Sequence, residues 1–369
     1  MAYVNKGCSS VTIRFLIGFL LLLLSLPLYA VQLEGLYTAS VAVEDQTQST
    51  RSAAIGLALN KVVQKVSGRR SALSNVALQA ALSNVGSYVE QFQYKQRDDE
   101  PGYWLIIRFQ KAALDRTLQQ FDVPVWGGNR PDILLWLAVD DAEQRYIAST
   151  ELDGEVAELV KQQALEAGLA VTLPLLDLAD QRALSFNDVW AGFPDQLRRA
   201  SQRYSVKQVM FGRLLKSKGT WRLNWTLMSE EGQKVGLEQS NDVAMILQQT
   251  FAQVSESLAD IYAPYGVTML DRQLRMDVSG VKDLTQFVQV TSYLSSLDMV
   301  KKLAWNQLND NKVTLELTIS GDVTVLKDII ALNEVLIPEF FPRGVTPVQL
   351  DMYVNPSQPP EPTLYYRAN

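Results

Sequence analysis

Alternating hydrophobic and polar positions open the first predicted unit of the chain, an α+β domain over residues 31–122. Residues 37–43 alternate in this way, which is typical of a strand with one buried face. After a polar stretch, apolar residues recur at helical spacing and predict a helix with one apolar face. Gly68 stands where the C-terminal cap of that helix belongs. The apolar stripe consists of Ile55, Leu59, Val62, Val63 and Val66.

A β-hairpin and a closing helix are predicted for the rest of this unit. Aromatic residues share one face of a strand over residues 88–94, and residues 103–109 alternate again as its partner. The polar stretch between them indicates a turn. It contains the acidic run from Asp98 to Glu100, which lacks the oxygen spacing of a calcium loop, so we interpret it as a solvated turn. A helix over residues 111–120 closes the unit.

A second unit, residues 132–263, is predicted to form a mixed sheet with helices packed on it. Its first strand, residues 133–139, is almost continuously apolar, as expected of a strand covered on both faces. The order then reads helix, strand, helix, three strands and a long helix, which favours a mixed α/β arrangement. The helices are predicted from the capping residue Asp153 to Ala167, over 194–204 and over 243–261, and the later strands over 169–173, 206–215, 221–228 and 233–239.

The third unit, residues 266–354, shows the βαββαβ element order of a ferredoxin-like domain. The tail, residues 355–369, is rich in proline and is predicted to be extended or disordered. The Gly- and Pro-rich stretch 123–131 is interpreted as a linker between the first two units. The predicted fold class is therefore α+β or mixed α/β, with two to three small domains in series and mixed sheets with helices packed on them.

The N-terminal segment has the layout of a secretory signal peptide. Lys6 and Arg14 precede an apolar run over residues 15–26, and the small residue Ala30 follows. This arrangement predicts export and removal of residues 1–30 by cleavage after Ala30, which places the mature chain in the periplasm. A retained membrane anchor is the alternative, but its stretch of 18 residues is short for a hydrocarbon core of about 30 Å.

The composition excludes several kinds of chemistry. The chain has no histidine, and its one cysteine, Cys8, lies in the predicted leader. The mature chain therefore lacks Ser-His-Asp and Cys-His nucleophiles, zinc sites built from His or Cys, and disulfides. Paired carboxylates, a serine activated by lysine, and calcium held by oxygen ligands stay open. We expect no cofactor and no metal.

The charge and hydropathy of the chain also limit which classes of partner we expect. The net charge is −6 and the pI is about 5.0, without the basic footprint of a nucleic-acid-binding protein. No stretch after the leader is long and apolar enough for a membrane span. We expect an envelope protein as partner, no nucleic acid, and no membrane span after cleavage; the sequence leaves the oligomeric state open.

Two pairs of residues are candidates for an interaction surface. Trp190 and Phe193 lie in a predicted loop before a helix, where they either mark an interface or pack onto the core. Arg69 and Arg70 follow the capping glycine Gly68, where they either contact an acidic partner or phosphate, or balance the dipole of the preceding helix.

Two further motifs are interpreted as structural. Asp140 and Asp141 follow a buried strand, a position where sites gather in α/β sheets, but position in the fold is weak evidence by itself, so we interpret them as solvated charges that open a loop. Ser279 and Lys282 have the spacing of a serine nucleophile and its lysine, but the partner motifs of that enzyme class are missing. No catalytic residue is assigned.

The N-terminal part of the chain resembles a known family. Leu36-Tyr37 opening a strand, the Ala- and Val-rich helix from Gln48, and the ending Val66-Ser67-Gly68-Arg69 resemble the DUF2066 family of exported proteobacterial proteins of unknown function. The same segment is more distantly similar to the N-terminal domain of flagellar assembly protein T. The second unit is similar in element order to the N-terminal domain of TolB. These resemblances imply a Gram-negative periplasm and interaction domains, and they carry no catalytic residues over.

Together these features favour a non-enzymatic scaffold or interaction protein of the Gram-negative envelope. Two alternatives stay open. A glycan hydrolase would need two carboxylates facing each other about 5–10 Å apart across a cleft. A ligand-binding module would need a large apolar pocket.

Overall fold

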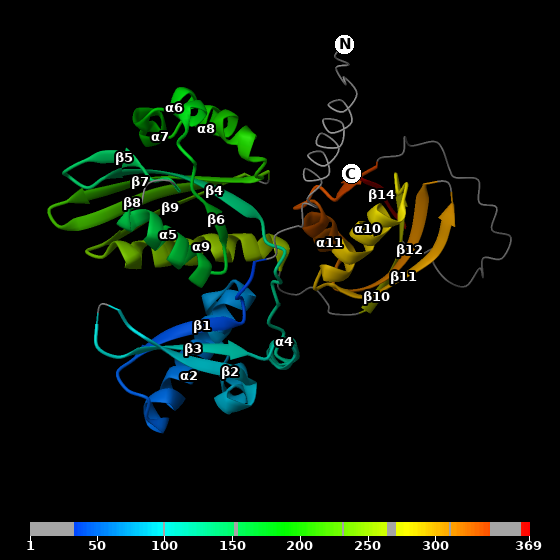
Figure 1. Cartoon of the computed structure of the whole chain (residues 1–369), viewed down its shortest axis with the longest axis horizontal. Helices are drawn as coiled ribbons and strands as arrows, with labels where there is room; N and C mark the ends of the chain where they lie inside the picture. The colour runs from blue at the N-terminus through cyan, green and yellow to red at the C-terminus, as the bar shows by residue number, and fades with distance from the viewer. Residues whose placement is uncertain are drawn as a thin grey trace, which may run out of the picture. The chain divides into compact units, whose positions relative to one another are not determined.

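The computed structural model describes residues 33–98, 100–150, 154–230, 232–263, 271–309, 311–339 and 363–369, which form three β-sheets with helices packed on them (Figure 1). The predicted class, mixed α+β with several sheet units in series, is confirmed. The predicted leader with Cys8 lies outside the described residues. Within these ranges, no helix combines the length and the apolar character needed to cross a bilayer.

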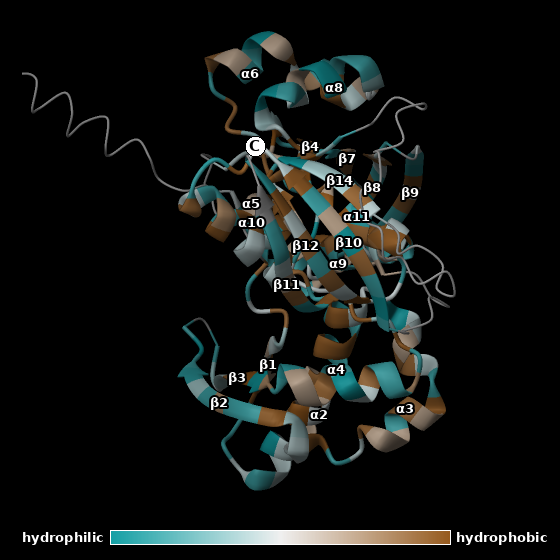
Figure 2. Ribbon diagram, turned by 90° about the vertical axis from the view of Figure 1, so that its right-hand side faces the viewer, coloured by the Kyte–Doolittle hydropathy of each residue, from teal (hydrophilic) through white to brown (hydrophobic). Residues whose placement is uncertain are grey.

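The first sheet has the strand order β1-β3-β2 and packs one face on helix α2. Thr47 caps α2 by accepting a hydrogen bond from the Thr50 N–H, and Gly68 ends it in the left-handed region, as predicted. Strand β2 is largely polar and exposed, and it is mostly teal in Figure 2. The elements are β1 (Thr38–Val43), α2 (Gln48–Ser67), η1 (Arg70–Ser74), α3 (Val76–Ala81), η2 (Val85–Tyr88), β2 (Val89–Gln96), β3 (Tyr103–Phe109) and α4 (Lys111–Gln120).

The second sheet has the order β5-β4-β7-β8-β9, and β6 pairs with β4. Its strands are β4 (Asp132–Asp140), β5 (Arg145–Ile147), β6 (Ala170–Thr172), β7 (Gln208–Ser217), β8 (Thr220–Met228) and β9 (Gln233–Ser240). Helices α5 (Glu155–Glu166) and α9 (Val243–Tyr262) cover one face, and α6 (Leu178–Ala183), α7 (Phe186–Ala191) and α8 (Pro194–Ser201) cover the other (Figure 1). A short turn, η3 (Gln202–Tyr204), follows α8.

Cover on both faces explains the continuous apolar run of β4. Leu134, Trp136 and Ala138 belong to the core beneath α7 and α8, while the residues between them turn to the opposite face, which α5 and α9 cover. Strand β4 is parallel to β6 and β7 but antiparallel to β5, so the sheet is mixed, as predicted.

One prediction about this sheet is wrong: Trp190 lies in a helix, not in a loop. Helix α7 has six residues and is held by a capping box between Ser185 and Asp188. A helix this short shows less than two turns of hydrophobic spacing, so its pattern is hard to tell from that of a loop. The predicted cap Asp153 lies outside the described residues, and Gly154 is the N-cap of α5.

The third sheet follows the predicted ferredoxin-like order with one strand added. The order is β11-β12-β10-β14-β13, so β11, β12 and β10 keep the split-βαβ arrangement. The elements are β10 (Asp271–Ser279), α10 (Leu284–Ser296), β11 (Val300–Asn309), β12 (Lys312–Ser320), α11 (Val323–Ile330), β13 (Leu336–Pro338) and β14 (Thr363–Ala368).

Strand β14 corrects the prediction of a disordered tail over residues 355–369. Residues 363–368 insert between β10 and β13, parallel to the first and antiparallel to the second. Leu364 and Tyr366 alternate with more exposed residues and are buried, which is why this segment forms a strand. The prolines that dominate the composition of the tail lie outside the described residues.

Candidate functional site

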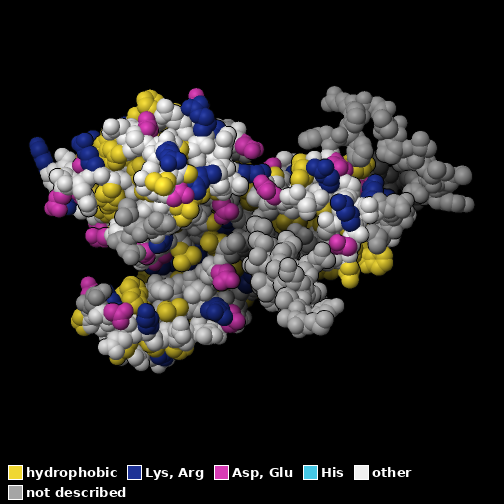
Figure 3. Space-filling model, turned by 45° about the horizontal axis from the view of Figure 1, so that its top comes forward, with side chains coloured by type: hydrophobic (Ala, Val, Ile, Leu, Met, Phe, Trp, Pro, Cys, Tyr) yellow, Lys and Arg dark blue, Asp and Glu magenta, His cyan; other side chains and the backbone are white. Residues whose placement is uncertain are grey.

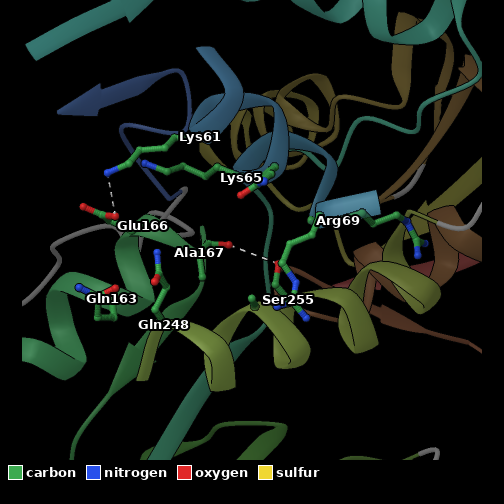
Figure 4. Close-up of a pocket in the computed structure, with 12 residues that line it drawn as sticks. Lys61, Lys65, Arg69, Gln163, Glu166, Ala167, Gln248 and Ser255 are labelled. Carbon is green, nitrogen blue, oxygen red and sulfur yellow. Dashed lines mark hydrogen bonds and ion pairs between the residues drawn. The ribbon is translucent and has the colours of Figure 1, made fainter. Parts of the chain in front are cut away.

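A small cleft of about 70 Å³ lies between helices α2, α5 and α9 (Figure 4). Its wall carries Lys61, Lys65 and Arg69 from α2 and its end, Gln163 and Glu166 from α5, and Gln248 and Ser255 from α9. We call these residues the junction cleft. Because the junction cleft brings together charged side chains of the first and second sheet units, it is a candidate for a binding or catalytic site.

Two lysines of α2 occupy the outer edge of strand β1. Lys65 Nζ donates to Thr38 O at 3.0 Å, and Lys61 Nζ donates to Ser40 O at 3.4 Å. The carbonyl of Tyr37 accepts a hydrogen bond from a backbone N–H of β3, so alternate carbonyls, those of Thr38 and Ser40, face away from that strand. The lysines therefore satisfy carbonyls that β3 does not reach, and they close this edge to another strand.

Lys65 is buried although it carries a charged group. The residue is 6% exposed, and this burial lowers the pKa of its ammonium to about 8, against the attraction of Glu166. Glu166 pairs directly with Lys61 at 3.3 Å, and Figure 4 shows the two side chains pointing toward one another. Each charge of this group thus has a structural partner.

The last carbonyls of α9 are taken up by Arg69. Its Nη2 donates to Ala259 O and Ala263 O, each at 3.0 Å, and its Nη1 pairs with Asp260. The Ala259 carbonyl also accepts the backbone N–H of Ala263, so Arg69 is a second donor there. The C-terminal end of a helix carries its negative dipole end, so a guanidinium suits both carbonyls. Ser255 of the same helix donates to Ala167 O at the end of α5, 3.3 Å away.

Arg130 binds backbone carbonyls at the C-terminal ends of two helices, α2 and α5. Its Nη1 donates to Gly168 O just beyond α5 at 2.7 Å, and its Nη2 donates to Lys65 O in the last turn of α2 at 2.8 Å. The same guanidinium also donates to Trp126 O at 2.7 Å and Gly127 O at 3.0 Å. Burial lowers the pKa of Arg130, and the surrounding carbonyl oxygens offset that cost by accepting its hydrogen bonds.

An aromatic stack continues this arrangement. The Arg130 guanidinium lies 4.0 Å from the centroid of the Trp126 ring, and that ring stacks on Tyr262 of α9 with centroids 6.2 Å apart. The backbone N–H of Trp126 donates to Val66 O near the end of α2. A Cβ added at Gly68 would lie 2.8 Å from Trp126, so this close approach requires glycine.

The stretch 123–131 is therefore a buried strap and not an exposed tether. Trp126 is 1% exposed and Arg130 6% exposed. The strap also contacts the third unit, because the Gly128 N–H donates to Asp298 Oδ2 at 3.2 Å, while Asp298 Oδ1 pairs with Lys111 at 2.8 Å. We call the contacts of Lys61, Lys65, Arg69 and Arg130 with the β1 edge and the helix ends the cationic clamp.

The structure separates the predicted interaction residues and buries one of them. Arg69 is 6% exposed, so the prediction that it belongs to a surface is wrong: α9 covers it. Arg70 is exposed, and its backbone N–H and Nε contact Glu256. Trp190 is half-buried and stacks on Phe186, while Phe193 is 52% exposed beside α8, on the sheet face opposite α9 (Figure 1).

The acidic motif after β4 forms a turn. Asp140 pairs with Arg145 at 2.8 Å, and Asp141 accepts the backbone N–H groups of Glu143 and Gln144, which lower its pKa. Asp141 also borders a hollow of about 770 Å³. Across the described ranges, no group of three or more Asp or Glu residues could hold a metal ion.

Arg130 of the clamp and Trp126, whose ring lies against it, were not among the predicted candidates. Trp126 and Arg130 stand four positions apart in a stretch interpreted as a linker. A tryptophan and an arginine are unusual in an exposed tether, and that was the available signal. Lys65 gives no signal of its own, because a lysine beside an apolar helix stripe normally reaches solvent.

Comparisons with known proteins give a domain family and no function. A family model described as a domain of unknown function, DUF8605, matches residues 30–127, a range that ends within the strap. It differs from the DUF2066 family that the sequence resembles, and that resemblance stays a prediction. No curated protein matches.

Solved structures show only faint likeness. The C-terminal domain of LpoB from Salmonella enterica is 16% identical, with a TM-score of 0.20, over 30% of this chain and 83% of that one. TolB from Acinetobacter baumannii is 16% identical, with a TM-score of 0.21, over 40% of this chain and 31% of that one. An uncharacterised protein is 14% identical, with a TM-score of 0.17, over 36% of this chain and 90% of that one. Likeness at these scores carries no argument about function.

Proposed function

We propose that this protein is a non-enzymatic scaffold or interaction protein of the Gram-negative cell envelope, working in the periplasm. The observation that carries the proposal is the cationic clamp. Three of its cations, Lys65, Arg69 and Arg130, are buried and bind helix ends and a strand edge, so these buried charges serve to join sheet units. Joined units hold their exposed loops and strand edges in a set relation, which is what a scaffold requires.

The surface supports the same proposal. Lys, Arg, Asp and Glu side chains are interspersed over the face in Figure 3, and no side chain there has the histidine colour. Large apolar side chains are exposed at separate points, among them Phe193 beside α8 and Trp305 on strand β11, which is 63% exposed. Exposed aromatic residues are enriched in protein interfaces.

Site-specific photo-crosslinking in living cells tests the proposal. A photoreactive amino acid replaces Phe193 or Trp305, and the matched control replaces Leu57, which is 59% exposed on α2. The proposal predicts a reproducible adduct with one envelope protein from an aromatic position and none from the control. Absence of adducts at both aromatic positions, in protein that is exported and folded, would contradict it.

A carboxylate-dependent glycan hydrolase is the second candidate, and the hollow beside Asp141 is the observation that favours it. Glu143, Glu155 and Asp242 also line this hollow, together with Trp221. However, Asp141 and Asp242 already accept backbone N–H groups, Asp242 as the cap of α9. Incubation of the mature protein with peptidoglycan tests this candidate: release of soluble glycan that the Glu155→Gln variant lacks would favour the hydrolase over the scaffold.

A further inference from the structure

Strand β9 is a long, regular sheet edge. Its eight residues pair with β8 without a register shift, and among the described residues no strand lies on its other side. The other sheet edges are closed or irregular. Strands β5 and β13 have three residues each, β2 and β11 contain register shifts, and lysines cover β1. A long regular edge is the kind that pairs with another chain.

The face of β9 turned away from α9 carries two exposed apolar residues at its centre, between Gln233 and Gln239. Val235 is 70% exposed and Leu237 57% exposed, and alternate residues of a strand share a face. Both border a hollow of about 580 Å³ whose far wall is the turn between α7 and α8. Helices α6 to α8 cover the sheet near β4 and leave this part open (Figure 1).

The opposite face of β9 carries opposite charges on either side of a glycine. Lys234 and Glu238 flank Gly236, and a Cβ at Gly236 would lie 2.4 Å from the Trp225 ring. Glu238 also accepts a hydrogen bond from Gln253 of α9, which holds its side chain on this face. If two copies of β9 paired antiparallel about Gly236, even-numbered residues of one copy would lie opposite even-numbered residues of the other, and odd opposite odd.

We propose that two copies of this chain associate through β9, antiparallel and with the two-fold axis at Gly236. In this register Lys234 of each copy lies opposite Glu238 of the other, and Val235 lies opposite Leu237. Both apolar residues then meet on one face and both ion pairs form on the other. A shift by one residue would turn the apolar face of one copy against the charged face of the other, and a shift by two would lose the charge pairing. Charge complementarity between Lys234 and Glu238 thus favours a second copy of this chain as the partner of β9. This inference does not depend on the proposed function.

Charge exchange tests the register. The exported mature protein is measured by sedimentation velocity over a range of concentrations. Wild type is expected to be a dimer, and K234E and E238K are each expected to weaken the dimer about tenfold, because each places like charges opposite at two positions. An equimolar mixture of the two variants is expected to restore the dimer, because Glu then faces Lys at both positions. K207E and E230K, which change exposed charges outside β9, are the matched controls.

A monomeric wild type at 100 μM would overturn the proposal. So would a dimer that both variants leave intact, or a mixture that stays dissociated while both variants show native circular dichroism. A second measurement does not depend on charge. In the mature protein, which without residues 1–30 contains no other cysteine, V235C mixed with L237C is expected to give an intermolecular disulfide on mild oxidation, with a higher yield than either variant alone. Equal yields in all three samples would contradict the register.

Discussion

The Arg130 guanidinium donates to the backbone carbonyl of Lys65 at 2.8 Å, and the side chain of Lys65 donates in turn to Thr38 O at 3.0 Å. One residue of α2 is thus held at its backbone by the strap and at its side chain by strand β1. Arg130 also reaches the end of α5, which belongs to the second sheet unit. These contacts run continuously from the first sheet to the second, and each link can be removed separately.

Arg130→Met is expected to destabilise the protein by about 3–5 kcal/mol, because it leaves several buried carbonyls without a donor. Arg130→Lys keeps the charge but not the planar set of donors, so it should recover only part of the loss. Arg145→Met is the control: Arg145 is exposed and pairs with Asp140, and its loss should cost less than about 1 kcal/mol. Urea unfolding followed by circular dichroism measures all three. Equal effects for Arg130→Met and Arg145→Met would count against the clamp.

Gly68→Ala is expected to cost more than Gly35→Ala. Both glycines have positive φ, +69° and +75°, so both alanines carry the strain of the left-handed region, about 1 kcal/mol. Only at Gly68 would the added Cβ also press on Trp126 and Ala259, each 2.8 Å away, whereas nothing lies within 4 Å at Gly35. The difference in unfolding free energy between the variants therefore measures the packing of the strap, and a difference near zero would mean that this packing is loose.

Lys65 predicts a rise in stability with pH. Its pKa is about 8 in the folded chain and 10.5 when unfolded, so between these values the unfolded state binds more protons. The free energy of unfolding should therefore increase by on the order of 3 kcal/mol as pH rises from 8 to 10.5. The same gain should be lost as pH falls back through this interval to 8. Lys65→Met removes the titrating group. The wild-type minus variant difference in unfolding free energy should show the rise, and a difference that is flat with pH would refute it.

Leu364→Asp is expected to unfold the third sheet, because Leu364 is 7% exposed in a strand between β10 and β13. A buried unpaired carboxylate costs several kcal/mol. Arg367→Asp, at an exposed position of the same strand, should be tolerated. Limited proteolysis of β10 to β13 distinguishes the two outcomes; similar resistance of both variants would mean that β14 is dispensable.

Local patterns predicted most of the elements, while contacts distant in sequence were not predictable. The stripe from Ile55 to Val66 and the run 133–139 gave helix α2 and strand β4, because periodicity is a local property. Strand β14 was missed because its partner β10 lies about 90 positions earlier, and proline-rich composition dominated the segment before it.

The site could be predicted least. Arg69 was identified from its place after a helix cap, where one interpretation was that it balances a helix dipole. It does bind the C-terminal end of a helix, but that helix is α9 and not α2, which it follows. No local pattern shows that the ends of α2, α5 and α9 meet. Arg130 and Trp126 therefore received no role from the sequence, although Arg130 binds the ends of α2 and α5 and Trp126 lies against its guanidinium.

Native-state hydrogen exchange tests most directly whether the clamp joins the first two sheet units. Strands β3 and β4 are interior strands of different sheets, each paired with a strand on both sides. If the clamp joins the units, their backbone amides exchange with the same opening free energy in the wild type, and β3 opens at a lower free energy than β4 in Arg130→Met. A wild-type protein in which β3 already opens well before β4, with no further change in Arg130→Met, would contradict it.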